Sequence, residues 1–449
     1  MLAAETGQEL RHVLRERLAG ARQQTDDLFG IVRSHALYER PIAERHRIVF
    51  YIGHLEAFDW NLLRERALGL SSVNPEFDRL FAFGIDPVGG GLPTDQPHDW
   101  PSLQRVREYV QQVRETLDRE LEPALSSGAN RVNGEFPVQL LLNVAIEHRL
   151  MHAETLAYML HQLPLDQKVK ALRRADVLAS AAGHVATSGS IEIPEGRASL
   201  GLSRDDPQAF GWDNEYEFHQ VHVPAFAIDK YKVSNGEYLE FIRAGGYDER
   251  SLWSDAGWSW KVEKGISHPV FWQRNGGEWH LRTMFEEIPL PLDWPVYVSH
   301  AEGSAYARWA GKKLPSEAQW HRAAFGTPGG EERKYPWGNE PPDSRHGNFD
   351  FQRWDPVPVT AFPAGQSAYG VAGMVGNGWE WTSSLFQPFA GFQRFSFYPG
   401  YSADFFDGKH YVMIGGSART AACMVRRSFR NWFQPHYQYV YAGFRCVKD

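Results

Sequence analysis

Three histidines have the residue type and the spacing to hold a metal ion. His148 and His152 lie four residues apart in the stretch EHRLMH, and residues four apart on a helix project from the same face. His54 lies in an earlier and separate pattern whose apolar residues recur with a period near 3.6, which predicts a helix with this histidine on its inward face. The apolar residues of that pattern are Ile48, Tyr51, Leu55, Phe58 and Leu62.

Each of these features also has a structural explanation. An inward-facing histidine is often a hydrogen-bonded core residue, and two histidines four residues apart arise by chance. Three neutral imidazoles on facing helices, however, form a type of site in which a helical bundle holds a metal and leaves positions free for other ligands. A structural metal in a binding module without catalysis is the alternative, but closed structural sites usually have four protein ligands. Imidazole ligation suits iron, zinc or copper, and the histidines do not choose among them.

The first part of the chain is predicted to be a four-helix bundle, residues 1–185. We expect helices at about 7–37, 41–68, 102–126 and 134–163, with His54 on the second and His148 and His152 on the fourth. Residues 77–102 are rich in glycine and proline and are predicted to form a long connection without a helix. Buried carboxylates near the histidines could orient the imidazoles; the candidates are Asp59, Glu147 and Glu154.

The rest of the chain, residues 186–449, is predicted to be a separate α+β domain, because 449 residues exceed what one core usually organises. Short β-branched and aromatic runs at 190–194, 220–223 and 226–228 predict strands. Helices are expected at 235–244 and 300–310, and a third after Ser316, an N-cap residue, with Gly326 as its stop.

Composition excludes several classes of partner. A net charge of −8 argues against nucleic acid or an anionic membrane as the main partner, so a small molecule is expected. An aromatic content of 14%, with 16 tryptophans, indicates a loop-rich domain or a stacking surface for a ligand. Only two cysteines occur, Cys423 and Cys446, and the first residues do not form an apolar run of signal-peptide length. These observations predict a cytoplasmic protein without a disulfide framework.

The second half of the sequence contains several long stretches of distinctive composition: FGWDNE, WPVYVSHAEGSAYARWAGKKLPSEAQWHRAA, YPWGN, GNGWEWTSS, GGS and SFRNWFQPHYQYVYAGFR. In these stretches the second half resembles the formylglycine-generating-enzyme/sulfatase-modifying-factor fold, a C-type-lectin-like domain. The first half resembles the DinB-like helical bundle, with its histidines where that fold places a metal. This order of domains is similar to that of the iron-dependent sulfoxide synthases of ergothioneine and ovothiol biosynthesis and of the related selenoneine synthases.

The resemblance implies an oxygenase. Members of that family hold a non-haem ferrous ion, Fe(II), on three histidines and use O₂ to join sulfur or selenium to the imidazole ring of hercynine, which is trimethylated histidine. Carried over by position, His54, His148 and His152 would be the ligands, and Asn431 and Trp432 would contact hercynine. A tryptophan face also suits a quaternary ammonium, although a purely structural role for Trp432 stays open.

Formylglycine generation is the obvious rival activity for the second domain. Enzymes of that type use two closely placed cysteines in their last segment to bind copper. Here Cys423 and Cys446 lie far apart in the sequence, and the segment SFRNWFQPHYQYVY between them contains no cysteine. The rival activity also leaves the histidines of the first domain without a role, so the oxygenase interpretation is favoured.

Two departures from the sulfoxide-synthase pattern bear on the chalcogen donor. Members that oxidise sulfur place a tyrosine after the WEWT motif or after the second bundle helix, to supply a proton or hydrogen. The corresponding segments here, 383–395 and 79–87, are rich in phenylalanine and contain no tyrosine, so no catalytic acid is assigned. Two alternatives stay open: these phenylalanines are core residues, or Tyr398 or Tyr401 takes the place of the missing tyrosine.

The second departure follows the Asn431–Trp432 pair. Members that bind γ-glutamylcysteine place an acid and a base there, whereas this chain has neutral aromatic and amide residues that suit a sugar. We therefore expect a selenosugar donor, as in selenoneine synthases, with ergothioneine-type transfer of sulfur from γ-glutamylcysteine or cysteine as the alternative. An arginine elsewhere, such as Arg79, Arg426, Arg427 or Arg430, could still supply the base. The predicted substrate-binding residues are Arg430, Asn431, Trp432, Phe433, Gln434 and His436.

Overall fold

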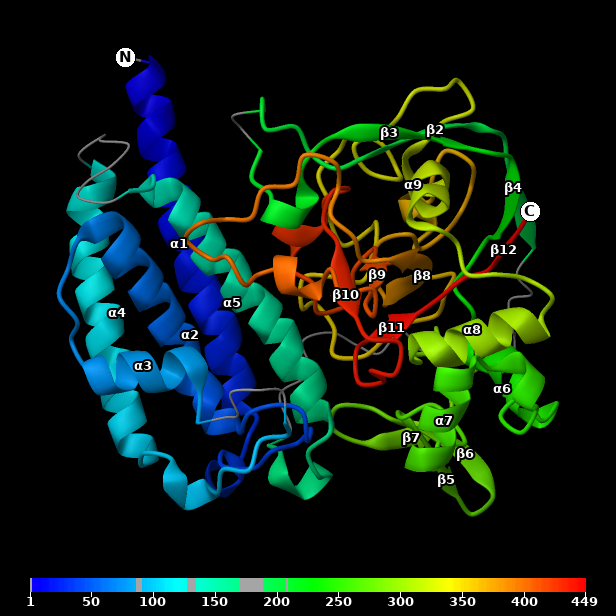
Figure 1. Cartoon of the computed structure of the whole chain (residues 1–449), viewed down its shortest axis with the longest axis horizontal. Helices are drawn as coiled ribbons and strands as arrows, with labels where there is room; N and C mark the ends of the chain where they lie inside the picture. The colour runs from blue at the N-terminus through cyan, green and yellow to red at the C-terminus, as the bar shows by residue number, and fades with distance from the viewer. Residues whose placement is uncertain (1, 86–90, 127–134, 170–188, 207–208) are drawn as a thin grey trace. The chain divides into compact units, whose positions relative to one another are not determined.

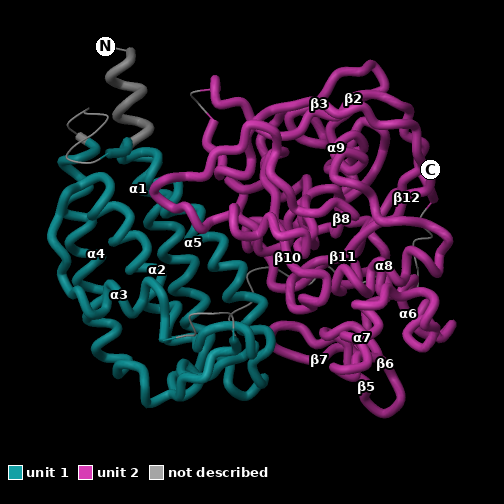
Figure 2. The backbone as a smooth tube through the Cα atoms, viewed as in Figure 1, with its two compact units in different colours: residues 1–171 teal, residues 172–449 magenta. Residues whose placement is uncertain are grey.

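The computed structural model describes residues 2–85, 91–126, 135–169, 189–206 and 209–449. The chain divides into two compact units, residues 1–171 and 172–449 (Figures 1 and 2). The predicted domain boundary at 185/186 falls within 170–188, which lies outside the described residues, so its position stays a prediction.

In its described residues, unit 1 is a bundle built from four long helices (Figure 1). They are α1 (Leu2–Gly30), α2 (Ile48–Leu63), α4 (Leu103–Ser126) and α5 (Val138–His161). Helix α1 packs against α5, and α2 packs against both α4 and α5. Two predicted bounds were wrong: α1 ends at Gly30 rather than near residue 37, and α2 begins at Ile48 rather than near residue 41, although a π-helical turn continues it to Leu68.

A fifth helix, α3 (Pro75–Phe83), corrects the prediction that 77–102 contains no helix. Its start has a local cause: the Asn74 side chain accepts a hydrogen bond from the backbone N–H of Phe77 at 3.1 Å, and proline suits the first helical position. Gly84 ends the helix with a φ of 74°, a conformation that favours glycine. These signals were present in the sequence, but the glycines and prolines that follow outweighed them in the prediction.

The bundle core contains a charged network centred on Arg149. This side chain is fully buried and donates to Asp59 Oδ2 at 2.6 Å and to Glu56 Oε1 at 2.9 Å, and Arg114 also donates to Glu56 at 2.7 Å. Burial raises the pKa of Asp59 to about 6 despite the nearby arginine. Burial also acts to raise the pKa of Glu56, but the charges of Arg149 and Arg114 outweigh it and lower that pKa to about 2.

The described residues of unit 2 form a mixed α+β structure with short strands in four small sheets. Among them, β1 (Ser190–Ile193) and β12 (Val447–Lys448) both run antiparallel to the same neighbour, β4 (Phe226–Asp229). A four-stranded sheet contains β8 (Trp379–Leu385), β9 (Tyr411–Ile414), β10 (Asn431–Phe433) and β11 (Ala442–Gly443). Its order is β10-β9-β8-β11, and β10 carries the Asn431–Trp432 pair.

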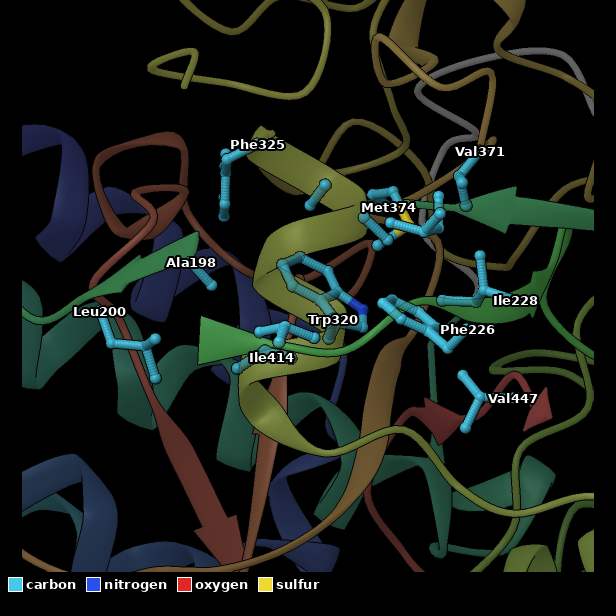
Figure 3. Close-up of a cluster of buried hydrophobic side chains, with 14 of the residues drawn as sticks. Ala198, Leu200, Phe226, Ile228, Trp320, Phe325, Val371, Met374, Ile414 and Val447 are labelled. Atoms are coloured by element: carbon cyan, nitrogen blue, oxygen red, sulfur yellow. The ribbon is translucent and has the colours of Figure 1, made fainter. Parts of the chain in front are cut away.

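One hydrophobic core cluster of unit 2 surrounds Trp320 on α9 (Glu317–Phe325). Figure 3 shows the Trp320 indole among side chains from the neighbouring strands, including Phe226 and Ile414. The helix begins where predicted, because the Ser316 hydroxyl accepts from the backbone N–H of Gln319 at 3.1 Å. The paired strands β2 (Gly196–Leu200) and β3 (His219–Val223) both lie against α9.

Two predicted helices of unit 2 are also present, as α6 (Asn235–Arg243) and α8 (His300–Trp309). The prediction missed α7 (Asp255–Lys264), which has Ser254 as its N-cap and Gly265 as its left-handed C-cap. It also missed the antiparallel sheet of β5 (Trp272–Asn275), β6 (Glu278–Arg282) and β7 (Glu287–Pro289). In the part of the chain that the structure describes, the helices are too short or too polar to cross a membrane.

The charged network yields a prediction about stability. Changing Arg149 to Met leaves Glu56 and Asp59 buried without their main counter-charge, so we expect a loss of about 3–5 kcal/mol in the free energy of unfolding. Arg119→Met is the matched control, because Arg119 is 65% exposed and pairs with the neighbouring Glu120; we expect it to cost less than about 1 kcal/mol. Denaturant unfolding of the full chain measures both, and equal losses would contradict the prediction.

Candidate metal centre

The structure brings the three predicted histidines together inside unit 1. His54 projects from α2, and His148 and His152 project from consecutive turns of α5, which packs against α2. One ring nitrogen from each histidine can be chosen so that all three lie within 4.8 Å of one another. Among the described residues, these three form the one group of at least three histidine, cysteine or carboxylate side chains with converging ligand atoms.

A backbone carbonyl sets the orientation of His54. Its Nδ1 lies 2.7 Å from the carbonyl oxygen of Phe81, and because a carbonyl can only accept, Nδ1 must carry the proton. The lone pair is therefore on Nε2, which is the atom available to a metal. Phe81 belongs to α3, so the helix missed in the prediction supplies this contact.

Aromatic rings pack against the imidazoles. Phe58 stacks on His148 with ring centroids 3.4 Å apart, Phe50 stacks on His54 at 4.7 Å, and Tyr51 lies tilted against His152 at 5.8 Å. These contacts restrict ring rotation and exclude water from much of the cluster. His148 is 3% exposed, whereas His54 and His152 keep partial exposure, so the cluster is not sealed.

The surroundings keep the imidazoles neutral. Burial lowers the pKa of His54 to about 4, and the nearby His46 and Arg149 act in the same direction. Burial, reinforced by the neighbouring imidazoles, lowers the pKa values of His148 and His152 well below their usual range. At neutral pH the three rings therefore offer lone pairs rather than protons, as metal ligation requires.

We predicted that a buried carboxylate orients the imidazoles, and the structure tests this for Asp59. Asp59 binds Arg149 through Oδ2, and the group that orients an imidazole is instead the carbonyl of Phe81. Glu147 and Glu154 are buried, and a role for them beside the histidines stays a prediction. A backbone carbonyl leaves no trace in residue type, so only the placement of α3 could reveal it.

The donor set fits a catalytic metal better than a structural one. Three neutral imidazoles with partial exposure leave coordination positions for substrates, whereas structural zinc sites usually fill four positions with protein ligands. The residues present accommodate Fe(II), and their chemistry also suits zinc or copper. His54, His148 and His152 would hold the ion.

Unit 2 holds the predicted hercynine contacts on β10. The Trp432 indole is half-buried and stacks on Phe386 with centroids 4.1 Å apart and planes 7° apart. Tyr401 lies edge-on to Trp432 at 5.5 Å, and Phe405 lies at 5.6 Å. One face of the indole thus belongs to the core. The sequence offered Tyr398 or Tyr401 in place of the missing tyrosine, and the ring of Tyr401 contacts Trp432.

The segment after Trp432 is partly exposed and aromatic. Phe433 stacks on Tyr437 at 4.9 Å, and His436 stacks on Trp260 at 5.2 Å. Gln434 is exposed. Trp260 lies on α7, so a helix absent from the prediction supplies a partner for one of the predicted substrate-binding residues.

Arg430 is 3% exposed and its nitrogens donate within the unit. Nε lies 2.8 Å from Glu317 Oε1, and Nη1 donates to the carbonyls of Asn214 and Gln387 at 3.3 and 3.1 Å. The guanidinium also lies over the Phe389 ring, 4.1 Å from its centroid. Direct substrate contact by Arg430 stays a prediction; its observed contacts hold together the segments that flank β10.

The other two arginines of this segment are also in ion pairs. Arg426 donates to both carboxylate oxygens of Glu215, and Arg427 pairs with Glu332 at 3.2 Å. Glu215 is fully buried and belongs to the FGWDNE stretch. Three of the arginines that could have supplied a base to the donor, Arg426, Arg427 and Arg430, therefore already have carboxylate partners. Arg79, on α3 of unit 1, is exposed.

Comparison with known proteins covers nearly the whole chain. Residues 176–449 match the family described as sulfatase-modifying factor enzyme 1-like domain, and residues 17–156 match the DinB superfamily. A hercynine oxygenase of Mycolicibacterium smegmatis is 38% identical over 98% of this chain and 99% of its own length. The chain belongs to the ergothioneine sulfoxide synthase-like family. The predicted fold class, a DinB-like bundle followed by a domain of the formylglycine-generating-enzyme type, is confirmed.

Two further relatives match over part of their length. A hercynine oxygenase of Mycobacterium tuberculosis is 43% identical over 53% of this chain and 56% of its own length. Ergothioneine biosynthesis protein 1 of Neurospora crassa is 28% identical over 92% of this chain and 55% of its own length. In both of these matches the chain spans about half of the relative's length.

The two cysteines lie outside the histidine cluster. Both are free thiols, and burial raises the pKa of Cys446 well above its usual range. Neither belongs to a group of three or more converging metal ligands among the described residues. The histidine cluster of unit 1 is therefore the candidate metal centre.

The first test of the centre is removal of its ligands. Changing His54, His148 or His152 to Ala should abolish stoichiometric Fe(II) binding while the helical circular dichroism remains, because two imidazoles hold the ion far less tightly than three. His98→Ala, at an 83% exposed side chain, is the control and should bind iron as the wild type does. Elemental analysis after anaerobic reconstitution gives the stoichiometry. Retention of iron by the triple variant would refute the assignment.

Proposed function

We propose that this protein is an Fe(II)- and O₂-dependent enzyme that joins a chalcogen to the imidazole ring of hercynine. The observation that carries the proposal is the cluster of three neutral histidines, whose ligand atoms lie within 4.8 Å, in a chain of this family. Support also comes from relatives named hercynine oxygenase and ergothioneine biosynthesis protein 1. The domain order of the chain is the one expected of such enzymes.

Bound ferrous iron would supply the one-electron chemistry that lets O₂ react with an organic substrate. The chain's own residues hold and shield this site. His54, oriented by the Phe81 carbonyl, offers Nε2, while the rings of Phe50 and Phe58 restrict water around the imidazoles. In the overall reaction, a ring C–H and a chalcogen–H bond are lost and a carbon–chalcogen bond forms. One oxygen atom of O₂ ends on the chalcogen and the other in water.

Asn431 and Trp432 are proposed to bind hercynine. Phe386 covers one face of the half-buried Trp432 indole, so a trimethylammonium group would have to bind the opposite face. The side-chain oxygen Oδ1 of Asn431 accepts from the backbone N–H of Trp432 at 2.8 Å, which orients the side-chain amide. The amide N–H₂ is then oriented to donate to a ligand.

Trp432→Ala tests this role. Loss of a desolvated cation–π contact should weaken hercynine binding by about 1–2 kcal/mol, which corresponds to roughly 5- to 30-fold. Trp432→Phe keeps an aromatic face and should retain part of the affinity. Anaerobic calorimetry of the full chain with hercynine and with histidine measures the contact. If the wild type bound both ligands equally, the trimethylammonium would have no recognised partner and this role would be wrong.

For the donor, we propose a selenosugar. Phe433, Gln434 and His436 offer partly exposed aromatic and amide groups, which suit the C–H faces and hydroxyls of a sugar. Arg426, Arg427 and Arg430 are each paired with a glutamate. A zwitterionic donor would leave its carboxylate and amine without fixed partners in this segment, at a cost of several kcal/mol if buried.

A competition assay tests the donor. The ferrous enzyme, O₂ and hercynine are offered a selenosugar, a thiosugar, γ-glutamylcysteine and cysteine together, and the products are identified by mass. We expect the sugar adducts to predominate, because sugars carry no charge that needs pairing. Predominance of a γ-glutamylcysteinyl or cysteinyl sulfoxide would overturn the selenium proposal in favour of ergothioneine-type sulfur transfer, and would leave the metal assignment intact.

A further inference from the structure

The contact between α3 and His54 points to a function for α3 that the ligands alone do not reveal. We propose that α3 is a positioning element, which fixes the tautomer and orientation of one metal ligand through the Phe81 carbonyl. The proposal rests on the proposed function only in taking His54 as a ligand. Three observations carry it: the hydrogen bond itself, the anchoring of α3 by a buried carboxylate, and a glycine that allows α3 to approach.

The hydrogen bond removes a choice that a free imidazole would have. Neutral histidine exchanges between two tautomers, and only the one protonated at Nδ1 presents a lone pair on Nε2. The Phe81 carbonyl, 2.7 Å from Nδ1, stabilises that tautomer and restricts rotation of the ring. Phe50, stacked on the same imidazole at 4.7 Å, adds a steric limit. His54 is therefore held ready to bind a metal before the metal arrives.

A buried carboxylate anchors α3 to the bundle. Asp78, on α3, accepts hydrogen bonds from Trp60 Nε1 of α2 at 3.1 Å and from the Tyr109 hydroxyl of α4 at 2.7 Å. Ser72 donates to the same carboxylate at 2.5 Å. Asp78 is 6% exposed, so these bonds are shielded from water and fix the helix against both neighbours. The Phe81 carbonyl, three residues further along the helix, is placed by this anchor.

A glycine next to the ligand permits the close approach. A Cβ atom at Gly53 would lie 2.4 Å from the Phe81 ring, far inside any allowed contact. Phe81 is fully buried and also packs against Trp100 and Tyr109, so its ring has little room to move away. Glycine in a helix interior is unfavourable relative to alanine. At this position it allows α3 to come within hydrogen-bond distance of the ligand on α2.

The test adds one methyl group. Gly53→Ala should displace Phe81 from α2 and lengthen or break the bond to His54, while all three histidines stay in the chain. Gly20→Ala is the matched control, because a Cβ there meets nothing within 4 Å. The first readout is ¹⁵N NMR of the metal-free full chain, with the His54 signal assigned by its absence in His54→Ala. We expect a protonated Nδ1 in the wild type and in Gly20→Ala, and a mixture of tautomers in Gly53→Ala.

The second readout is affinity for Co²⁺, followed by its visible absorption. Loss of a group that orients a ligating histidine typically lowers metal affinity about 10- to 100-fold, and we expect a loss of that size in Gly53→Ala and none in Gly20→Ala. Asp78→Asn should also lower the affinity, because an amide nitrogen cannot accept the hydrogen bonds that hold α3. Circular dichroism confirms that each variant is folded.

A double variant keeps the test decisive if Gly53→Ala is destabilised. Phe81→Ala removes the ring atoms that the new methyl group would meet but keeps the backbone carbonyl. Gly53→Ala combined with Phe81→Ala should therefore regain Co²⁺ affinity and the single tautomer relative to Gly53→Ala. Wild-type tautomer and affinity in folded Gly53→Ala would overturn the positioning role, as would a double variant no better than Gly53→Ala. Failure of the wild type to bind Co²⁺ would instead refute the metal centre.

Discussion

The dehydration of three imidazoles on facing helices is the constraint on which the candidate centre depends. In water a histidine is partly protonated near neutral pH, and three charged rings with one nitrogen of each within 4.8 Å of the others would repel one another. Packing against Phe50 and Phe58 disfavours the charged form, and the buried Arg149 acts in the same direction through its charge. The bundle therefore holds three lone pairs close together, an arrangement that a divalent cation relieves.

Ion pairs with Glu56 and Asp59 allow the bundle to bury Arg149 next to the histidine His148. Arg149 follows His148 directly in α5, so its side chain leaves the helix toward a different set of neighbours. Glu56 and Asp59, one turn apart on α2, balance its charge and connect the two helices that carry the histidines. The spacing of α2 and α5, and with it the distance between the ligands, is thereby fixed by ion pairs as well as by apolar packing.

Unit 2 uses its charges differently. Three arginines between 426 and 430 are paired with glutamates from three separate parts of the chain, so these ion pairs tie the segment before β10 to its surroundings. The residues that follow are aromatic or amide groups with partial exposure. The arginine side chains thus stabilise the structure, and the partly exposed uncharged residues after β10 remain available for ligands. This division of roles is the physical basis for proposing an uncharged donor.

Local patterns in the sequence were enough to predict the bundle helices and the Ser316 cap, because helical period and capping depend on neighbouring residues. The same patterns placed His54 on an inward face and His148 and His152 on one helix face, and the packing of α2 against α5 brings the three together. Helix α3 was missed although its own cap was present, because the glycines and prolines beyond it suggested a loop. The carbonyl on His54, the ion pairs of the arginines and the stacking of His436 on Trp260 depend on segments far apart in the chain. Only the tertiary structure decides such contacts, since a backbone oxygen has no sequence signature and an arginine does not reveal its partner.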